Sequence, residues 1–145
     1  MEIQPKNMTE EEKALCKKAI EEYKMIRPVV QLGDIYRLVS PYDKLGVASL
    51  MYVSEAKDKA VFYWWKTEHF VNQHLPRVTM AGLQPDKSYR IRELNRIDNE
   101  PLAFEGKVFT GAYLMEQGLE IPYNHRVDYH KQNDYSSRVL YLEEV

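Results

Sequence analysis

Residues 60–66 read Ala60-Val61-Phe62-Tyr63-Trp64-Trp65-Lys66. Aromatic and β-branched side chains of this kind favour a β-strand. Because side chains alternate along a strand, Tyr63 and Trp65 fall on one face and Phe62 and Trp64 on the other, and both faces are apolar. A strand in an isolated antiparallel sheet usually keeps one wet face. This one is therefore expected to be covered on both sides by a loop, another subunit or another domain, or to present an exposed aromatic platform.

Runs of similar character flank this segment at intervals of about ten residues, separated by Pro, Gly, Asp and Asn. The expected strands are Asp34–Val39, Val47–Val53, Ala60–Lys66, Arg77–Leu83, Tyr89–Leu94, Lys107–Met115 and Ser137–Leu142. This spacing predicts a mainly β fold, an antiparallel β-sandwich of about seven strands preceded by one amphipathic α-helix. Strands and helices do not alternate, which argues against a doubly wound nucleotide-binding fold.

The segment Leu83–Ile91 contains a turn centred on Pro85-Asp86, followed by the alternating strand that holds Tyr89. A tyrosine in this position often sends its hydroxyl back to the backbone of the preceding turn, as in the tyrosine corner of sandwich domains. Tyr89 as a plain core ring is the other interpretation. Both support the same fold.

The helix is expected from about Thr9 to Ile26. Thr9 and Glu12 form a capping-box pattern at its start, and Pro28 is expected to end it, since the residue before a proline is disfavoured in helical conformation. Its apolar stripe consists of Leu15, Ala19, Tyr23 and Ile26. An amphipathic helix needs a surface on which to lay such a stripe.

The composition limits the classes of function. A chain of 145 residues is one domain in length and large enough for a hydrophobic core, and its single Cys16 gives no disulfide framework. Lys and Arg number 20 against 22 Asp and Glu, so no basic face for nucleic acid is expected. The sequence contains no run of roughly 18 apolar residues, so it predicts no membrane span. The acidic, polar first residues do not resemble a targeting signal.

We expect no catalytic residue, metal site or cofactor in this chain. The sequence has no glycine-rich phosphate loop, nucleophile elbow or paired-cysteine spacing. His69, His74, His125 and His130 form two pairs whose spacing a zinc site would permit but does not require. The 22 carboxylates include no pair singled out for glycosidase chemistry.

The segment Tyr23–Asp43, YKMIRPVVQLGDIYRLVSPYD, resembles the junction between the catalytic barrel and the carboxy-terminal domain of glycoside hydrolase family 36 α-galactosidases. The family pattern there is an Ile-Arg-Pro turn followed by a Gln-x-Gly-Asp-x-Tyr-Arg-Leu strand. Further matching segments are Met51–Ser54, Ala60-Val61, the turn from Gly82-Leu83 to Tyr89, and Thr110–Met115 with Gly118. The resemblance covers nearly the whole chain.

The resemblance implies a part of a larger enzyme. Family members cleave terminal α-galactosyl residues with retention, using two barrel aspartates, one in a Lys-x-Asp motif, and neither motif is found here. Residues 1–28 would be the last barrel helix plus a linker, and residues 29–145 the non-catalytic β-sandwich domain that stabilises the barrel and assists subunit assembly. The partners implied are the missing barrel, α-galactosides through the parent only, and further copies in a homo-oligomer. The expected barrel-interface residues are Leu15, Ala19, Tyr23, Ile26, Phe62 and Trp64.

The alternative function is a carbohydrate-binding module that stacks a sugar on Tyr63, Trp64 or Trp65. Exposure decides between the two hypotheses, because a binding platform needs its rings in solvent. The polar loops Lys66–Asn72 and Asn124–Asn133 are expected to border the active site of the parent.

Overall fold

The computed structural model describes residues 4–68, 76–94, 96, 101–121 and 136–145. Its helical elements are the 3-10 turns η1 (Pro5–Asn7) and η2 (Pro41–Asp43) and the helices α1 (Glu10–Leu32) and α2 (Gly111–Glu116). Its strands are β1 (Asp34–Val39), β2 (Val47–Val53), β3 (Lys59–Lys66), β4 (Ser88–Glu93), β5 (Val108–Thr110) and β6 (Ser136–Glu144). The predicted mainly antiparallel β fold with a preceding helix is confirmed.

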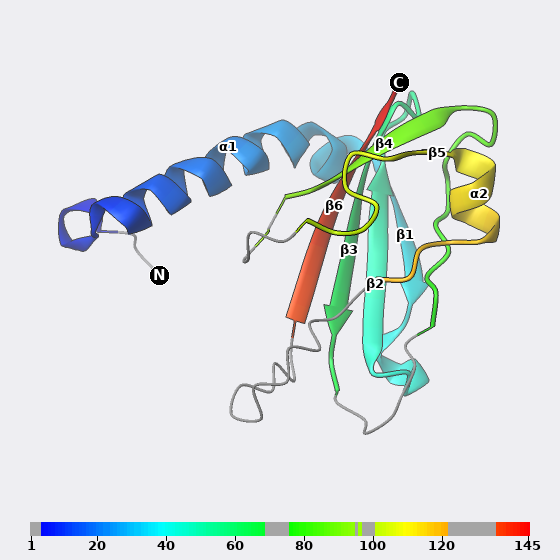
Figure 1. Ribbon diagram of the computed structural model, residues 1–145, viewed down its shortest axis with the longest axis horizontal. Helices are drawn as coiled ribbons and strands as arrows, with labels where there is room; N and C mark the ends of the chain where they lie inside the picture. The colour runs from blue at the N-terminus through cyan, green and yellow to red at the C-terminus, as the bar shows by residue number, and fades with distance from the viewer. Residues whose placement is uncertain (1–3, 69–75, 95, 97–100, 122–135) are drawn as a thin grey trace.

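The strands form one antiparallel sheet in the order β1-β2-β3-β6-β4-β5 (Figure 1). The last strand, β6, lies between β3 and β4 and pairs with β3 along the whole length of β3. We call the sheet face that carries Phe62 and Trp64 the inner face, and the opposite one, with Tyr63 and Trp65, the outer face. The most central strands therefore come from the middle and the end of the sequence.

The main core lies on the inner face. Irregular segments and α2 cover it there, contributing Val78, Met80, Leu83, Leu102, Phe104, Leu114, Leu119 and Ile121. The expected strand at Arg77–Leu83 belongs to this covering layer and forms only a single bridge, between Val78 and Leu119. Its apolar side chains are buried as those of a strand would be. They are buried by packing on the face of the sheet, and the segment forms no ladder of hydrogen bonds with the sheet.

The expected strand Lys107–Met115 is wrong in its second half, where the chain turns into α2. The hydroxyl Oγ1 of Thr110 accepts the backbone N–H of Tyr113 (3.2 Å), which caps the helix. A Cβ on Gly111 would lie 2.0 Å from the carbonyl oxygen of Gln84, so only glycine fits at the first helical position. A helical turn then points Leu114 into the core, where it is fully buried.

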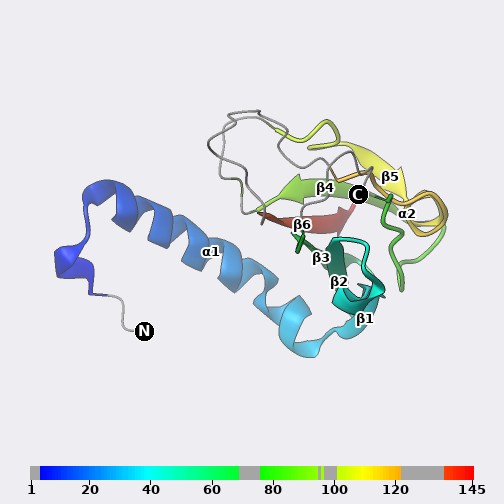
Figure 2. The same ribbon diagram turned by 90° about the horizontal axis from the view of Figure 1, so that it is seen from below.

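A smaller cluster occupies the outer face, where the last turns of α1 pack. Ile26 and Val29 of α1 are buried there against Val61, Leu94 and Tyr141. In Figure 2, α1 approaches the sheet from the side opposite to α2. The rest of α1 extends away from the sheet (Figure 1).

The predicted start of α1 is confirmed and its predicted end is wrong. Glu12 N–H donates to Oγ1 of Thr9 (3.2 Å), and Thr9 N–H donates to Glu12 (2.7 Å), so the capping box is complete. Pro28 lies inside the helix, which continues to Leu32. A proline costs the helix one hydrogen bond, but Ile26 and Val29 on either side of it are buried on the sheet. Burial of these two side chains stabilises the helical path that the local preference disfavours.

Candidate functional site

The two rings on the inner face of β3 are not available to a partner or a ligand. Phe62 is 0% exposed and Trp64 is 1% exposed, and both belong to the main core. This corrects the prediction that Phe62 and Trp64 contact a barrel, and it removes Trp64 as a sugar platform. The irregular segments and α2 cover the inner face of β3, which the sequence analysis expected another part of the parent to cover.

The outer face of β3 keeps its aromatic rings partly in solvent. Tyr63 and Trp65 are half-buried and stack on each other, with ring centroids 5.7 Å apart and planes at 9°. Tyr52 from β2 meets Tyr63 edge-on at 6.2 Å. Burial raises the pKa of Tyr63, and the nearby hydroxyls of Tyr52 and Tyr23 add to this effect. These rings form a continuous aromatic surface beside α1.

The expected stripe of α1 divides into a buried and an exposed part. Ile26 is 7% exposed and packs on the chain's own sheet, which corrects its assignment to a barrel interface. Leu15 is 66% exposed, Tyr23 is 51% exposed, and Ala19 between them is exposed as well. Ile20, which the sequence analysis did not single out, is also 49% exposed. The first half of α1 therefore presents apolar side chains to solvent, and Tyr23 follows them beside Tyr63 of β3.

An open, mainly apolar groove of about 530 Å³ lies where α1 ends and the β2–β3 turn begins. Pro28, Leu32, Glu55 and Lys59 are among its lining residues, and Leu32 is 83% exposed. Ser54 also lines the groove, and its hydroxyl donates to Asp58 (2.6 Å).

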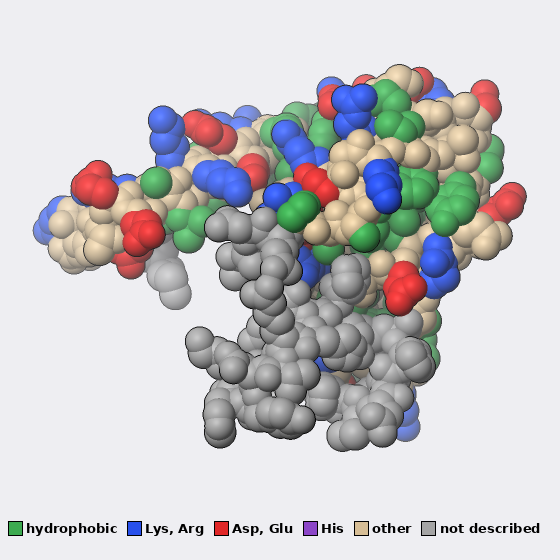
Figure 3. Space-filling model, in the orientation of Figure 1, with side chains coloured by type: hydrophobic (Ala, Val, Ile, Leu, Met, Phe, Trp, Pro, Cys, Tyr) green, Lys and Arg blue, Asp and Glu red, His purple; other side chains and the backbone are tan. Residues whose placement is uncertain are grey.

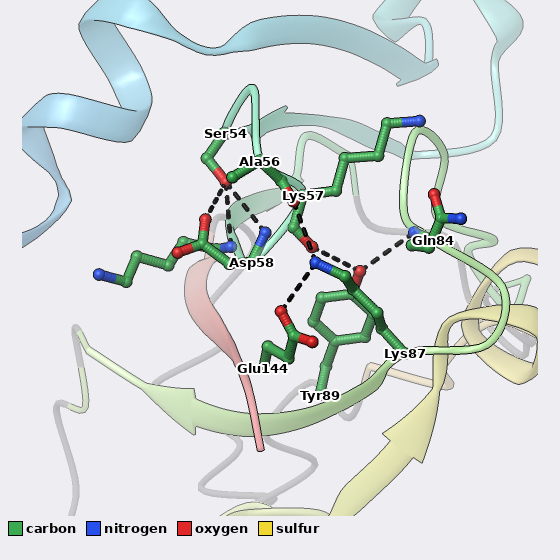
Figure 4. Close-up of polar contacts among 9 residues, drawn as sticks. Ser54, Ala56, Lys57, Asp58, Gln84, Lys87, Tyr89 and Glu144 are labelled. Atoms are coloured by element: carbon green, nitrogen blue, oxygen red, sulfur yellow. Dashed lines mark hydrogen bonds and ion pairs between the residues drawn. The ribbon is translucent and has the colours of Figure 1, made fainter.

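Tyr89 fulfils both of its predicted roles. Its ring is fully buried in the core, and its hydroxyl accepts the backbone N–H of Gln84 (3.0 Å) and donates to the carbonyl of Lys57 (2.8 Å) (Figure 4). Burial raises the pKa of this phenol. One hydroxyl thus joins the turn before β4 to the turn between β2 and β3, which is a structural rather than a chemical task.

Charged groups around this hydroxyl complete the same connection (Figure 4). Lys87 donates to Glu144 (2.8 Å) at the end of β6 and to the carbonyl of Ala56 (3.0 Å). Asp58 accepts from the hydroxyl of Ser54 (2.6 Å), which holds the pKa of this carboxyl below its usual range. Each of these groups is engaged within the chain, so the network fastens three segments together.

Two carboxylates come together at the far end of β4, and both are engaged in ion pairs. The side chain of Glu93 is fully buried and pairs with Arg138 (2.7 Å) on β6. Glu105 pairs with Arg96 (3.0 Å) and accepts the backbone N–H of Glu93 (2.8 Å). A glycosidase pair has to reach the substrate bond, whereas Glu93 is closed off from solvent. The sequence contains a signal for this site, because Glu93 is a charged residue on the otherwise apolar face of an alternating strand.

Within the residues that the structure describes, no group of His, Cys, Asp and Glu could hold a metal ion. The four histidines, at 69, 74, 125 and 130, lie outside the described residues, and so do the polar loops beyond Glu68 that were expected to border an active site. No helix of the described part is long and apolar enough to cross a membrane.

A second aromatic pair was not predicted from the sequence. Phe109 on β5 and Tyr113 on α2 stack with ring centroids 5.3 Å apart and planes at 19°. Arg77, 36 residues earlier, donates to the Tyr113 hydroxyl (3.3 Å). The expected strand over this region would have put both rings on one face, but it gave no hint of Arg77.

Comparison with known proteins gives a consistent result. The family model of the glycosyl hydrolase family 36 C-terminal domain matches residues 47–142. Probable α-galactosidase G of Aspergillus terreus is 28% identical over 143 residues, which cover 99% of this chain and 17% of that protein. α-Galactosidase AgaA of Geobacillus stearothermophilus is 30% identical over 122 residues, covering 84% of this chain and 15% of that one.

The solved structures agree with the sequence relatives. The crystal structure of the same Geobacillus enzyme, described as a GH36 α-galactosidase, aligns with a TM-score of 0.76 and 27% identity over 99% of this chain and 17% of that one. The galactosidase domain of the α-galactosidase–sucrose kinase AgaSK aligns with a TM-score of 0.73 and 25% identity, again over 99% of this chain and 17% of that one. The chain thus spans about one sixth of the length of the relatives it matches.

Proposed function

The chain belongs to the family of glycosyl hydrolase family 36 C-terminal domains, and on this premise we propose that it is the non-catalytic C-terminal β domain of an α-galactosidase. Its task is to hold the catalytic barrel of the same parent and to assist subunit assembly. The parent would hydrolyse terminal α-galactosyl residues with retention. The α-galactosidase names of the relatives support this assignment.

The observation that carries the proposal is the exposed part of α1. The helix is 23 residues long, yet its buried residues are only Ile26 and Val29, both near its end. In proteins, most of the stability of a helix comes from tertiary packing of its amphipathic face. A barrel that packs on Leu15, Ala19 and Tyr23 would supply that cover, with α1 as its last helix. We place the division between this helix and the β domain at Gly33, since residue 28 falls inside α1.

The aromatic surface on the outer face extends the same contact area. Tyr63 and Trp65 are rigid, half-buried rings, and aromatic residues of this kind dominate the binding energy of protein interfaces. They lie on the face that α1 crosses, so one partner could cover the helix and the rings together. In this proposal Tyr63 and Trp65 are contacts for the barrel and not a sugar platform.

The test uses the polypeptide encoded upstream of Met1 in the gene, produced as a separate chain and mixed with this one. Association and α-galactosidase activity are expected in the mixture, and no turnover of an aryl α-galactoside by this chain alone. Leu15→Glu should weaken association by about 30-fold, equivalent to about 2 kcal/mol. Ala14→Glu is the matched control, because it adds the same charge on the other side of α1.

Two results would contradict the proposal. One is an upstream sequence without a barrel and its Lys-x-Asp motif. The other is measurable hydrolysis by the isolated chain, since no catalytic residue is assigned to it.

A further inference from the structure

The stacked pair Phe109 and Tyr113 lies at the β5–α2 end of the molecule, where hydrophobic side chains gather on the surface (Figure 3). Phe109 is half-buried and packs against the main core, whereas Tyr113 is 39% exposed. Phe109 thus supports the Tyr113 ring from the protein side.

Hydrogen bonds restrain Tyr113 at its backbone and at its hydroxyl. Its backbone N–H donates to Oγ1 of Thr110, in the cap of α2 (3.2 Å). Its hydroxyl accepts from Nη2 of Arg77 (3.3 Å). The ring is therefore a fixed surface and not a freely rotating side chain.

Arg77 is itself fixed beside the ring. Its Nε donates to the carbonyl of Gln117 and its Nη2 to the carbonyl of Gly118, both at 2.8 Å. No hydrogen bond of the remaining nitrogen, Nη1, to another described residue is found. An arginine carries five N–H donors in a rigid fork, so within the described part of the chain Nη1 has two donors to offer a ligand at the edge of the Tyr113 ring.

We propose that Tyr113 and Arg77 form a sugar-binding platform for a neutral, galactose-containing oligosaccharide. The C–H face of a pyranose ring packs on the Tyr113 ring, and a sugar hydroxyl accepts a hydrogen bond from Nη1 of Arg77. Because both side chains are already ordered, little conformational entropy is lost on binding. The choice of galactose as the sugar rests on the proposed function, whereas the platform chemistry does not.

The position of the platform keeps it separate from the proposed barrel contact. α2 packs on the inner face through Leu114, while α1 packs on the outer face through Ile26 and Val29. A partner that covers α1 and the outer face leaves Tyr113 in solvent. The platform would then act as an additional contact for carbohydrate.

Tyr42 provides a matched control within the same chain. Its side chain is 89% exposed, more than that of Tyr113, and it stacks on no other ring in the described part of the chain. If exposure alone made a sugar site, Tyr42 would be the better one. Among the tyrosines that the structure describes, a supporting ring and a hydrogen-bonded guanidinium occur together at the exposed Tyr113.

The experiment is a titration of the isotope-labelled chain with raffinose, followed by NMR chemical shifts. Saturable shifts are expected for residues around Tyr113, Phe109 and Arg77, with a dissociation constant on the order of millimolar, as for a contact of this small area. Tyr113→Ala should abolish the saturable shifts. Tyr113→Phe, which keeps the ring, and Tyr42→Ala should retain them.

The absence of saturable shifts in the unchanged protein would overturn the proposal, and so would shifts that persist in Tyr113→Ala. Equal shifts with maltose would overturn the galactose assignment. A dispersed spectrum of Tyr113→Ala verifies that the variant is folded. The mixing experiment with the upstream polypeptide is read independently, because Tyr113→Ala is not expected to change that association.

Discussion

The two faces of β3 carry the same kind of side chain in different surroundings. Phe62 and Trp64 on the inner face are fully buried under the irregular layer and α2, while Tyr63 and Trp65 on the outer face stack on each other and stay half-buried. The inner face is a completed core. Within the described part of the chain, the outer face is covered where the end of α1 reaches it. The aromatic side chains of one strand therefore complete a core on one side and remain half-buried on the other.

The largest expected effect comes from opening the completed core. Trp64→Ala should reduce the free energy of unfolding by about 3–5 kcal/mol, because it removes a fully buried ring and leaves a cavity. Urea unfolding followed by circular dichroism measures this change. A loss no greater than that of Trp65→Ala would show that the two faces of β3 are equivalent after all.

The sequence predicted those features that local chemistry decides. The Thr9–Glu12 capping box, the β1 and β2 strands and the role of Tyr89 all depend on residues close together in the chain. Pro28 was misjudged because its local preference competes with burial of Ile26 and Val29 on strands that come later in the sequence.

The candidate sites also divide into features that depend on neighbouring residues and features that depend on residues far apart in the sequence. The apolar stripe predicted that Leu15 and Tyr23 need a covering surface, and the structure shows that both are exposed in this chain. The burial of Trp64 could not be predicted, because its cover comes from irregular segments such as those holding Met80 and Phe104. The Tyr113 platform was missed for a related reason, since Arg77 reaches it from 36 residues away.

A smaller loss of unfolding free energy is expected when only the hydrogen bonds of the Tyr89 hydroxyl are removed. Tyr89→Phe keeps the ring in place but leaves the N–H of Gln84 and the carbonyl of Lys57 without their common partner. The expected loss of unfolding free energy is about 1–3 kcal/mol. Urea unfolding measures it, with Tyr42→Phe as a control that should change nothing. Equal stability of the two variants would mean that the Tyr89 hydroxyl does not connect the two turns.

Alkaline pH should act on the outer face through Tyr141, whose ring packs under α1. Burial, with the adjacent carboxylate of Glu143, raises the pKa of Tyr141 to about 12. An unfolded tyrosine loses its proton near pH 10, so the folded state keeps the proton longer. The contribution of the protonated Tyr141 to the free energy of unfolding is therefore complete below about pH 10 and is lost as the pH rises towards 12.

Thermal unfolding across this pH range, together with tyrosinate absorbance, measures the effect. Tyr141→Phe should unfold with a weaker dependence on pH, because it removes the group whose pKa differs most clearly between the two states. An unchanged pH dependence in this variant would assign the alkaline loss to Tyr63 and Tyr89, whose pKa values are also raised by burial.

The smallest change in stability is expected from Trp65→Ala. Trp65 is half-buried, and its stacking contact with Tyr63 is worth about 0.5–1.5 kcal/mol. Urea unfolding of the isolated chain should therefore shift by roughly 1 kcal/mol, well below the effect of Trp64→Ala. Titration with raffinose should leave the tryptophan fluorescence without a saturable change, since this surface is proposed for a protein partner. If Trp65→Ala costs little stability and yet weakens association with the upstream polypeptide, the outer face serves binding; if both stay unchanged, the half-buried rings have no role in that contact.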